Sequence, residues 1–273
     1  MANQNLNGRV AIVTGGSRGI DREIAIHLHS LGARVIINYA SSSKQAEELA
    51  SQLNTNSSEL SAIAVKADVS DPDEVKLLFD KAEQEMGQVH VLVNSAGVLD
   101  PKYPSLADTT VDDWDKTFSI NTKGAFLVCR EAANRLARGG ARRIIMITTS
   151  AVGGLMPGYA AYAASKAAVE TITKIVAKEL KGTGITANCV APGPVATELF
   201  FAGKSEETMN KMKDACPLGR LGQPQDVSPV VGFLAGDAGQ WINGQVLRVN
   251  GGSVIKPSKD GVETHKKSVS ECI

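Results

Sequence analysis

The chain has 273 residues, of which 43% are hydrophobic and 21% are charged, a composition that suits one large α/β unit. Basic and acidic residues balance at 29 each and only 4% of residues are aromatic, which argues against a nucleic-acid or anionic-membrane surface. No apolar run approaches the roughly 20 residues that a membrane-spanning helix needs.

Apolar, strand-like runs alternate with helical stretches along the chain, and no break in composition divides it. We expect strands, in chain order, at Val10–Val13, Arg34–Asn38, Ser61–Lys66, Val89–Val93, Arg143–Thr148, Thr186–Val190 and Gln245–Val249. Seven buried strands joined by helices predict one doubly wound parallel sheet with helices on both faces. We assign residues 1–253 to this domain and predict that 254–273, polar and mixed in charge, form a disordered extension.

A glycine-rich turn follows the first expected strand and leads directly into a helical pattern. It contains Gly15, Ser17, Arg18, Gly19 and Ile20. In this arrangement backbone N–H groups and the helix N-terminus face an anion, so the turn predicts a Rossmann-type phosphate cradle. The alternative is an ordinary turn between a strand and a helix.

Tyr162 and Lys166 are four residues apart, so on a helix they share one face. A nearby cation favours the phenolate, and the pair could therefore exchange a proton with a substrate oxygen near neutral pH. The alternative is an exposed lysine beside a half-buried tyrosine with no chemical role.

Together with Asn94-Ser-Ala-Gly97, Asn121, Ser150 and Pro192–Thr197, these motifs resemble the short-chain dehydrogenase/reductase family from about Leu6 to Gly252. Within it the chain is most similar to plant NADPH-dependent aldehyde or carbonyl reductase-like members, through the phrases Ile37–Ser41 and Trp241–Val246.

The resemblance implies four catalytic residues. Tyr162 would protonate the substrate oxygen, and Lys166 would lower the Tyr162 pKa and hydrogen-bond the nicotinamide ribose. Asn121 would hold a water that links Lys166 to solvent. Ser150 would orient the substrate oxygen, with Thr149 as the alternative because the register is open by one residue.

The stretch Asn38, Tyr39, Ala40 and Ser41 lacks the acid that pairs with the ribose of NAD, and Arg18 offers a guanidinium to a phosphate, so we predict NADPH/NADP⁺. The resemblance adds further cofactor contacts at Asp68, Val69, Asn94, Ala96, Gly97, Pro192, Gly193, Val195 and Thr197, besides Tyr162 and Lys166. Asp68 could instead cap a strand end.

Asp21 departs from the family pattern, which has glycine at this position. A carboxylate there adds bulk and negative charge near the bound pyrophosphate, so we expect weaker cofactor binding. An acid in the first helical turn nevertheless suits the helix dipole of the protein alone.

The segment from Glu198 to about Pro217 would close an apolar substrate pocket over a small-molecule aldehyde, ketone or alcohol. The predicted activity is NADPH-dependent carbonyl reduction. Alternatives are alcohol oxidation in specialised metabolism and an NADP-binding scaffold whose turnover is weak or lost because of Asp21.

Four further expectations concern the whole chain. The family implies a homotetramer, or a dimer, built through the stretches Asn121–Arg138 and Tyr162–Lys181. The four cysteines form no metal-binding pattern and are expected to be reduced. We expect no metal site, no nucleic-acid partner and no membrane partner. The uncharged amino end resembles neither a secretory signal nor a transit peptide, which predicts a cytoplasmic protein.

Overall fold

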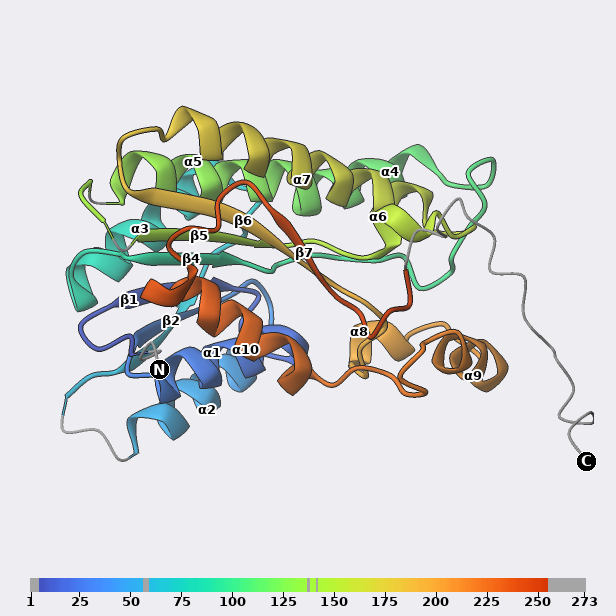
Figure 1. Cartoon of the computed structure of the whole chain (residues 1–273), viewed down its shortest axis with the longest axis horizontal. Helices are drawn as coiled ribbons and strands as arrows, with labels where there is room; N and C mark the ends of the chain where they lie inside the picture. The colour runs from blue at the N-terminus through green and yellow to red at the C-terminus, as the bar shows by residue number, and fades with distance from the viewer. Residues whose placement is uncertain (1–4, 56–58, 137, 141, 255–273) are drawn as a thin grey trace, which may run out of the picture.

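The computed structural model describes residues 5–55, 59–136, 138–140 and 142–254 (Figure 1). Its centre is a seven-stranded sheet of order β3-β2-β1-β4-β5-β6-β7 in which every neighbouring pair is parallel. The strands are β1 (Val10–Thr14), β2 (Arg34–Tyr39), β3 (Ala62–Lys66), β4 (Val91–Asn94), β5 (Arg142–Ile147), β6 (Ile185–Pro192) and β7 (Val246–Val249). All seven expected strands are confirmed, with slightly shifted ends. The extension expected at 254–273 lies, apart from Val254, outside the described residues.

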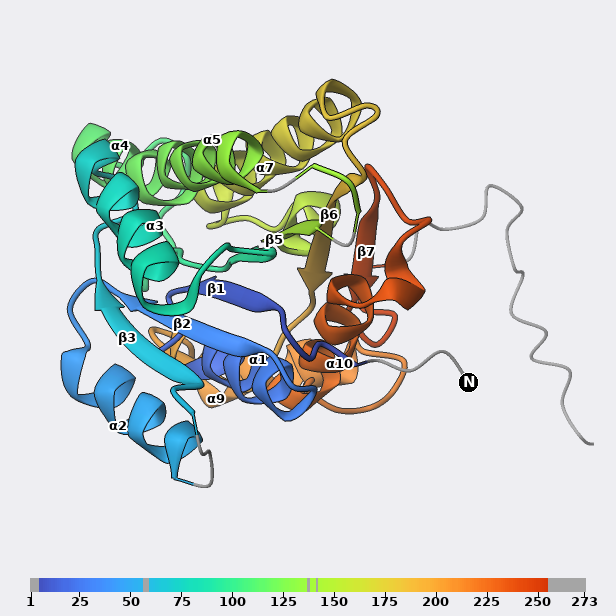
Figure 2. The same ribbon diagram turned by 90° about the vertical axis from the view of Figure 1, so that its left-hand side faces the viewer.

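Two layers of helices cover the sheet, because successive side chains of a strand point to opposite faces. In β1, Val10 and Ile12 belong to the core on one face, whereas Ala11 and Val13 belong to the core on the other. The first face is covered by α3 (Pro72–Met86), α5 (Ala125–Arg135) and α7 (Ala160–Glu179), and the second by α1 (Gly19–Ser30), α2 (Ser43–Asn54) and α10 (Pro224–Ala235) (Figure 2). The doubly wound α/β fold is confirmed.

The expectation of seven buried strands was wrong at the edges of the sheet. The central strands are fully buried, as in the patterns of β1 and β6, whereas β7 keeps all of its residues half-buried or exposed. An edge strand has a neighbour on one side only, so part of it stays in contact with solvent.

The long helix expected at Asn121–Arg138 is interrupted. The structure has α4 (Val111–Phe118), a π-helical turn (Ser119–Gly124) and then α5. The π turn buries the Asn121 side chain completely. π turns inside helices occur frequently at functional sites. The second long helix, expected at Tyr162–Lys181, is confirmed as α7 with both ends slightly earlier.

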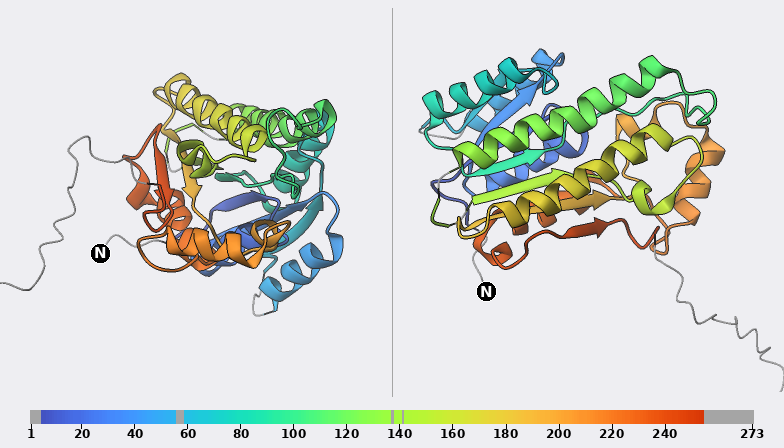
Figure 3. Two further views of the ribbon diagram at one scale, coloured as in Figure 1. Left: turned by 90° about the vertical axis from the view of Figure 1, so that its right-hand side faces the viewer. Right: turned by 90° about the horizontal axis from the view of Figure 1, so that it is seen from above.

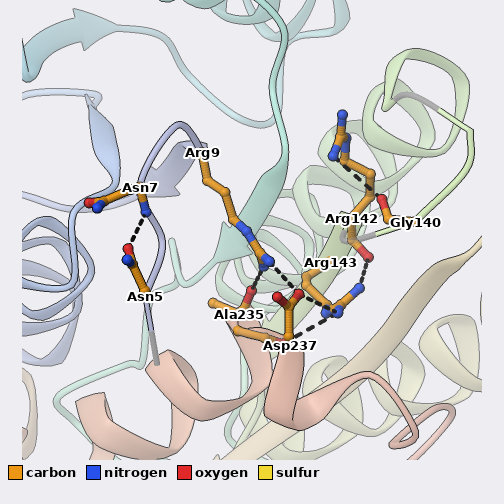
Figure 4. A network of polar contacts seen from close by, with 9 residues as sticks. Asn5, Asn7, Arg9, Gly140, Arg142, Arg143, Ala235 and Asp237 are labelled. Atoms are coloured by element: carbon orange, nitrogen blue, oxygen red, sulfur yellow. Dashed lines mark hydrogen bonds and ion pairs between the residues drawn. The ribbon is translucent and has the colours of Figure 1, made fainter. Parts of the chain in front are cut away.

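An ionic cluster holds the edge of the sheet where β1 and β5 begin (Figure 4). Arg9 donates to the Ala235 carbonyl and to the carboxylate of Asp237, both at the end of α10. Arg143, only 2% exposed, donates to the Gly236 carbonyl at 3.3 Å and lies 4.0 Å from Asp237. These contacts tie α10 to the sheet at the edge opposite the glycine turn.

At the carboxyl edge, β1 has β2 on one side and β4 on the other, so the chain reverses its direction of winding there. Open α/β sheets bind ligands outside the carboxyl ends of their strands at such a switch point. Figure 3 shows three short helices gathered at one end of the molecule, namely α6 (Ala151–Gly154), α8 (Glu198–Phe201) and α9 (Glu206–Asp214).

Candidate functional site

The glycine turn lies where β1 passes into α1. Gly15 and Gly19 have φ angles of +71° and +58°, which favour glycine. A Cβ on Gly15 would lie 3.1 Å from the Ala96 Cα, so the turn also packs against the loop after β4. Arg18 is the N-cap of α1 and its side chain makes no capping hydrogen bond. The first N–H groups of α1 therefore remain able to meet an anion.

Asn38 holds this turn in place through hydrogen bonds. It is 1% exposed, its Nδ2 donates to the Ala67 carbonyl at 2.9 Å, and its backbone carbonyl accepts from the Gly16 N–H at 3.0 Å. Asn38 thus links β1 to β3, while Tyr39 is half-buried and Ala40 and Ser41 are exposed. The expected cofactor segment therefore contains one supporting residue and three accessible ones.

Arg18 extends from the turn into solvent, with a side chain that is 67% exposed and lies 3.6 Å from the Glu198 carboxylate of α8. Its guanidinium is accessible, but a competing carboxylate that the sequence did not reveal lies beside it.

The loop after β4 is held by Thr14, the last residue of β1. Its hydroxyl donates to the Asn94 Oδ1 at 2.9 Å and accepts from the N–H groups of Ser95 and Ala96 at 3.0 and 3.1 Å. Asn94 is therefore committed to shaping the loop, which leaves the backbone of Ala96 and Gly97 for close contact with a ligand.

Lys166, Asn121 and Gly97 converge at the carboxyl end of β5. Lys166 is 3% exposed and its Nζ donates to the Ile147 carbonyl at 3.0 Å. A Cβ on Gly97 would lie 3.2 Å from both the Lys166 Nζ and the Asn121 Oδ1. Asn121 exchanges two hydrogen bonds with the Val98 backbone at 2.8 and 2.9 Å. Glycine at 97 thus keeps this corner open.

Tyr162 lies one helical turn before Lys166, and a small pocket opens on it between the loop after β4, α4 and the start of α7. Burial raises the pKa of Tyr162 to about 12, a hydrogen bond from Thr149 opposes this shift, and the negative charge of Asp21 adds to it. Desolvation dominates this balance, and the expectation that Lys166 lowers the Tyr162 pKa stays a prediction. Burial likewise lowers the pKa of Lys166 to about 8.

The two candidate hydroxyls beside Tyr162 have different partners. Ser150 is 3% exposed and its Oγ donates to the Ala191 carbonyl at 3.0 Å. Thr149 is half-buried, accepts from the Ala151 N–H at 3.2 Å and faces Tyr162. The register that the sequence left open therefore stays open.

The turn after β6 completes the cleft opposite the glycines. A Cβ on Gly19 would lie 3.5 Å from the Thr197 Cγ2, so the two turns are in contact. The Thr197 hydroxyl accepts from the Phe200 N–H at 3.2 Å and caps α8. Val195 is 4% exposed, and a Cβ on Gly193 would lie 2.7 Å from Asn250.

Asp68 follows β3 and is exposed. Its Oδ1 accepts from the Ser70 N–H at 2.8 Å and from the Ser70 hydroxyl at 2.7 Å. The capping role that the sequence offered as an alternative is therefore present, and Val69 behind it is buried against Gly124.

The segment after β6 reaches across to the loop after β4, a contact that the sequence did not predict. The Tyr103 hydroxyl donates to the Ala202 carbonyl at 3.2 Å, and the Lys204 Nζ donates to the Phe200 carbonyl at 2.6 Å and to Tyr103. The Lys204 Nζ also lies 4.3 Å from the centre of the Tyr103 ring. Tyr159 stacks at a tilt on Tyr103 and meets Tyr162 edge-on. Aromatic side chains thus form a wall that leads from the segment Phe200–Lys204, called the lid below, to Tyr162.

Asp21 is half-buried in the first turn of α1, and its Oδ1 accepts from the Ser95 hydroxyl. A Cβ on Gly15 would lie 2.8 Å from its Oδ2. Burial raises the pKa of Asp21 to about 7, although Ser95, Lys166 and Arg18 all favour the charged form. Ser95, from the Asn94–Gly97 motif, is its direct partner.

The described residues contain no group of three or more His, Cys, Asp or Glu side chains placed to hold a metal ion. Within the same ranges, no helix combines the length and the apolar character needed to cross a bilayer.

The residues suit a dinucleotide, since glycine at 15 and 97 lets the backbone approach a ligand closely and α1 directs its N–H groups at the same cleft, which the Asp21 carboxyl narrows. The fold and the site are therefore those of a dinucleotide-dependent oxidoreductase. A family model described as enoyl-(acyl carrier protein) reductase matches residues 15–254. The chain belongs to the short-chain dehydrogenase/reductase family.

Two relatives come from Arabidopsis thaliana. The "NADPH-dependent aldehyde reductase-like protein, chloroplastic" is 60% identical, with 91% of this chain and 95% of the relative covered. The "NADPH-dependent aldehyde reductase 2, chloroplastic" is 54% identical, with 92% and 95% covered. A short-chain dehydrogenase from Burkholderia cenocepacia, solved in complex with NADP, is 33% identical with a TM-score of 0.84, covering 91% of this chain and 99% of that one.

These relatives correct one expectation. The amino end predicted a cytoplasmic protein, but both Arabidopsis relatives are named as chloroplastic, and the cytoplasmic assignment is wrong.

Proposed function

We propose that this protein reduces an aldehyde or ketone to an alcohol with NADPH, with Tyr162 as the proton donor. The observation that carries the proposal is that Lys166, one helical turn after Tyr162, lies against Gly97 in the loop that also packs on the glycine turn at the switch point of the sheet. Bound NADPH would supply the hydride. The names of the two Arabidopsis relatives support the same cofactor and the same reaction class.

Tyr162 is suited to donate a proton at neutral pH, because a phenol whose pKa is about 12 remains protonated there. Lys166, held by the Ile147 carbonyl beside Gly97, is placed to hydrogen-bond the nicotinamide ribose and to stabilise the phenolate once the proton has left. Asn121 fixes the loop at Val98 and so keeps this corner in shape.

The choice of NADP(H) rests on the end of β2, where Ala40 and Ser41 are exposed and no acid is present to repel a 2′-phosphate. Arg18, with its exposed guanidinium, would bind that phosphate. Asp68, Val69, Ala96 and the Pro192–Thr197 turn remain proposed contacts of the adenine and nicotinamide ends.

Tyr162→Phe removes the hydroxyl and little else. We expect kcat/KM for carbonyl reduction to fall by about 10²–10⁴-fold, the usual contribution of a positioned acid, while the Kd for NADPH, measured by fluorescence, changes little. Loss of NADPH absorbance at 340 nm with a panel of aldehydes and ketones gives the rate. Equal turnover by wild type and Tyr162→Phe would contradict the proposal.

Ser150→Ala and Thr149→Val, measured in the same assay, separate the two candidate hydroxyls. Ser150 remains the proposed donor to the substrate oxygen, which requires its hydroxyl to turn away from the Ala191 carbonyl. A larger loss of kcat in Thr149→Val would transfer that role to Thr149.

A second function has one observation in its favour. Asp21 places a carboxyl inside the proposed cofactor cradle, which would suit a nucleotide-binding scaffold with weak turnover. Binding of NADPH without consumption across the substrate panel, and equally without oxidation of alcohols by NADP⁺, would favour that scaffold.

Two properties of the whole protein are also proposed. We propose a homotetramer, because apolar side chains are exposed on α5 and α7, where Phe126 is 45% and Ile175 is 49% exposed. We also propose a plastid location from the names of the Arabidopsis relatives. Import of the labelled full-length chain into isolated chloroplasts would test the location.

A further inference from the structure

Asp21 lies where the proposed cofactor site is most crowded. Its carboxyl occupies the gap between the glycine turn and the loop after β4, in contact with Ser95 and close to Gly15. Other charged or titratable groups that act on it are Arg18 from the turn and Lys166 and Tyr162 from α7. Asp21 is the only acidic residue in the first turn of α1, within the described residues.

The charge of this carboxyl is finely balanced. Removal from water favours the neutral acid, whereas the Ser95 hydroxyl and the cations Lys166 and Arg18 favour the carboxylate. As a result both forms coexist near neutral pH. Ser95 can keep its hydrogen bond in either state, because a hydroxyl can donate to a carboxylate and accept from a protonated carboxyl.

A dinucleotide would change that balance. The pyrophosphate of a bound dinucleotide sits at the N-terminus of the first helix, which is the turn that contains Asp21. Two like charges in one desolvated site repel each other, and the group that can neutralise takes up a proton. The phosphates would also attract Arg18, one of the cations that favours the Asp21 carboxylate.

We propose that Asp21 is a proton-coupled part of the cofactor site, which binds NADPH when its carboxyl is neutral. The inference rests on the proposed function only in the choice of NADPH. One proton moves from the buffer to a carboxylate oxygen of Asp21 as the cofactor enters, and no other bond changes. Affinity for NADPH therefore falls as pH rises through the Asp21 transition.

Asp21→Asn tests the proposal because it keeps the shape and a hydrogen bond to Ser95 but cannot titrate. NADPH binding is measured by calorimetry from pH 7 to 9 in two buffers of different ionisation enthalpy, which gives the number of protons taken up. For each unit of pH, we expect the Kd of wild type to rise by up to about tenfold more than the Kd of Asp21→Asn. At pH 8 wild type should take up close to one proton more than the variant.

The cofactor phosphates are present in both proteins and cancel in this comparison. The Asp21 charge raises the pKa of Lys166, so the difference between the two proteins reports on Asp21 together with its effect on Lys166. Glu23→Gln is the matched control, since Glu23 lies two residues further along α1 and accepts from Gln225 at 2.8 Å on the surface. Its pH dependence should equal that of wild type.

A pH titration of Asp21 in wild type without cofactor tests the inference even if Asp21→Asn misfolds. The carboxyl carbon of Asp21, followed by NMR in the protein alone and assigned by its absence from Asp21→Asn, should titrate near neutral pH. Titration near the ordinary aspartate value, or equal proton uptake by wild type and Asp21→Asn, would overturn the inference. Proton-coupled NADPH binding without carbonyl turnover would sink the proposed function and leave the inference standing.

Discussion

At the scale of single residues, Asp21 has a consequence for stability that needs no cofactor. A carboxyl whose pKa rises from 3.8 to about 7 on folding is held protonated by the folded protein while the unfolded chain is already ionised. Stability is therefore lost as pH rises from about 4 to about 7, and the full cost remains above that window.

Asp21→Asn should remove this cost. The shift corresponds to about 4 kcal/mol, and because Asp21 is half-buried we expect a gain in the free energy of unfolding of about 2 to 4 kcal/mol at pH 8. The gain should shrink toward zero at pH 4. Urea unfolding of both proteins at several pH values measures it, and a gain independent of pH would count against the buried carboxyl.

The site residues divide into those that short motifs reveal and those that only folding brings together. Spacing alone pointed to the turn at Gly15–Gly19 and to the pair Tyr162 and Lys166. It could not reveal that Ser95 meets Asp21 from 74 residues away. For the same reason the pKa of Tyr162 could not be predicted from the sequence, since desolvation and the Asp21 charge are properties of the packed site.

At the scale of elements, the lid depends on the absence of a side chain at Gly203. Its φ is +72°, and a Cβ there would lie 1.7 Å from the Pro101 carbonyl oxygen. This close approach seats Ala202 and Lys204 on Tyr103. The contact joins the loops after β4 and β6 across the proposed pocket.

Gly203→Ala should push the lid off the loop. A Cβ at position 203 would force the backbone of Pro101 or of the lid to move. We therefore expect KM for the carbonyl substrate to rise by about 10-fold or more, while the NADPH Kd changes little. Gly182→Ala is the control, because Gly182 has a similar φ of +79° with nothing within 4 Å of its Cβ position. If both variants raise KM equally, backbone strain rather than the lid contact is responsible.

The elements themselves were largely predictable, for a physical reason. Buried parallel strands are continuous apolar runs, so a run such as Val10–Val13 identifies its strand without any knowledge of the neighbours. The π turn at Ser119–Gly124 left no such mark, because it depends on the Asn121 side chain reaching Val98 in another segment. The burial of the edge strands was overestimated, because the sequence of a single strand does not indicate its position in the sheet.

At the scale of the whole molecule, exposed apolar side chains point to further copies of the chain. Phe126 on α5 and Ile175 on α7 lie on the layer that covers one face of the sheet, and these helices run side by side (Figure 3). Trp241, near β7, is 96% exposed. Two separate apolar sites of this kind suit two different symmetric contacts, which together would build a tetramer.

Light scattering should therefore give a mass four times that of the 28.7 kDa chain. We expect Ile175→Asp and Trp241→Asp each to halve that mass, because each places a charge in one proposed contact and leaves the other intact. Leu77→Asp is the control, since Leu77 is 62% exposed on α3, which packs beside α5 but carries neither proposed contact. A monomer for wild type at micromolar concentration would contradict the proposal. Dissociation by Leu77→Asp as well would show that the contacts lie elsewhere.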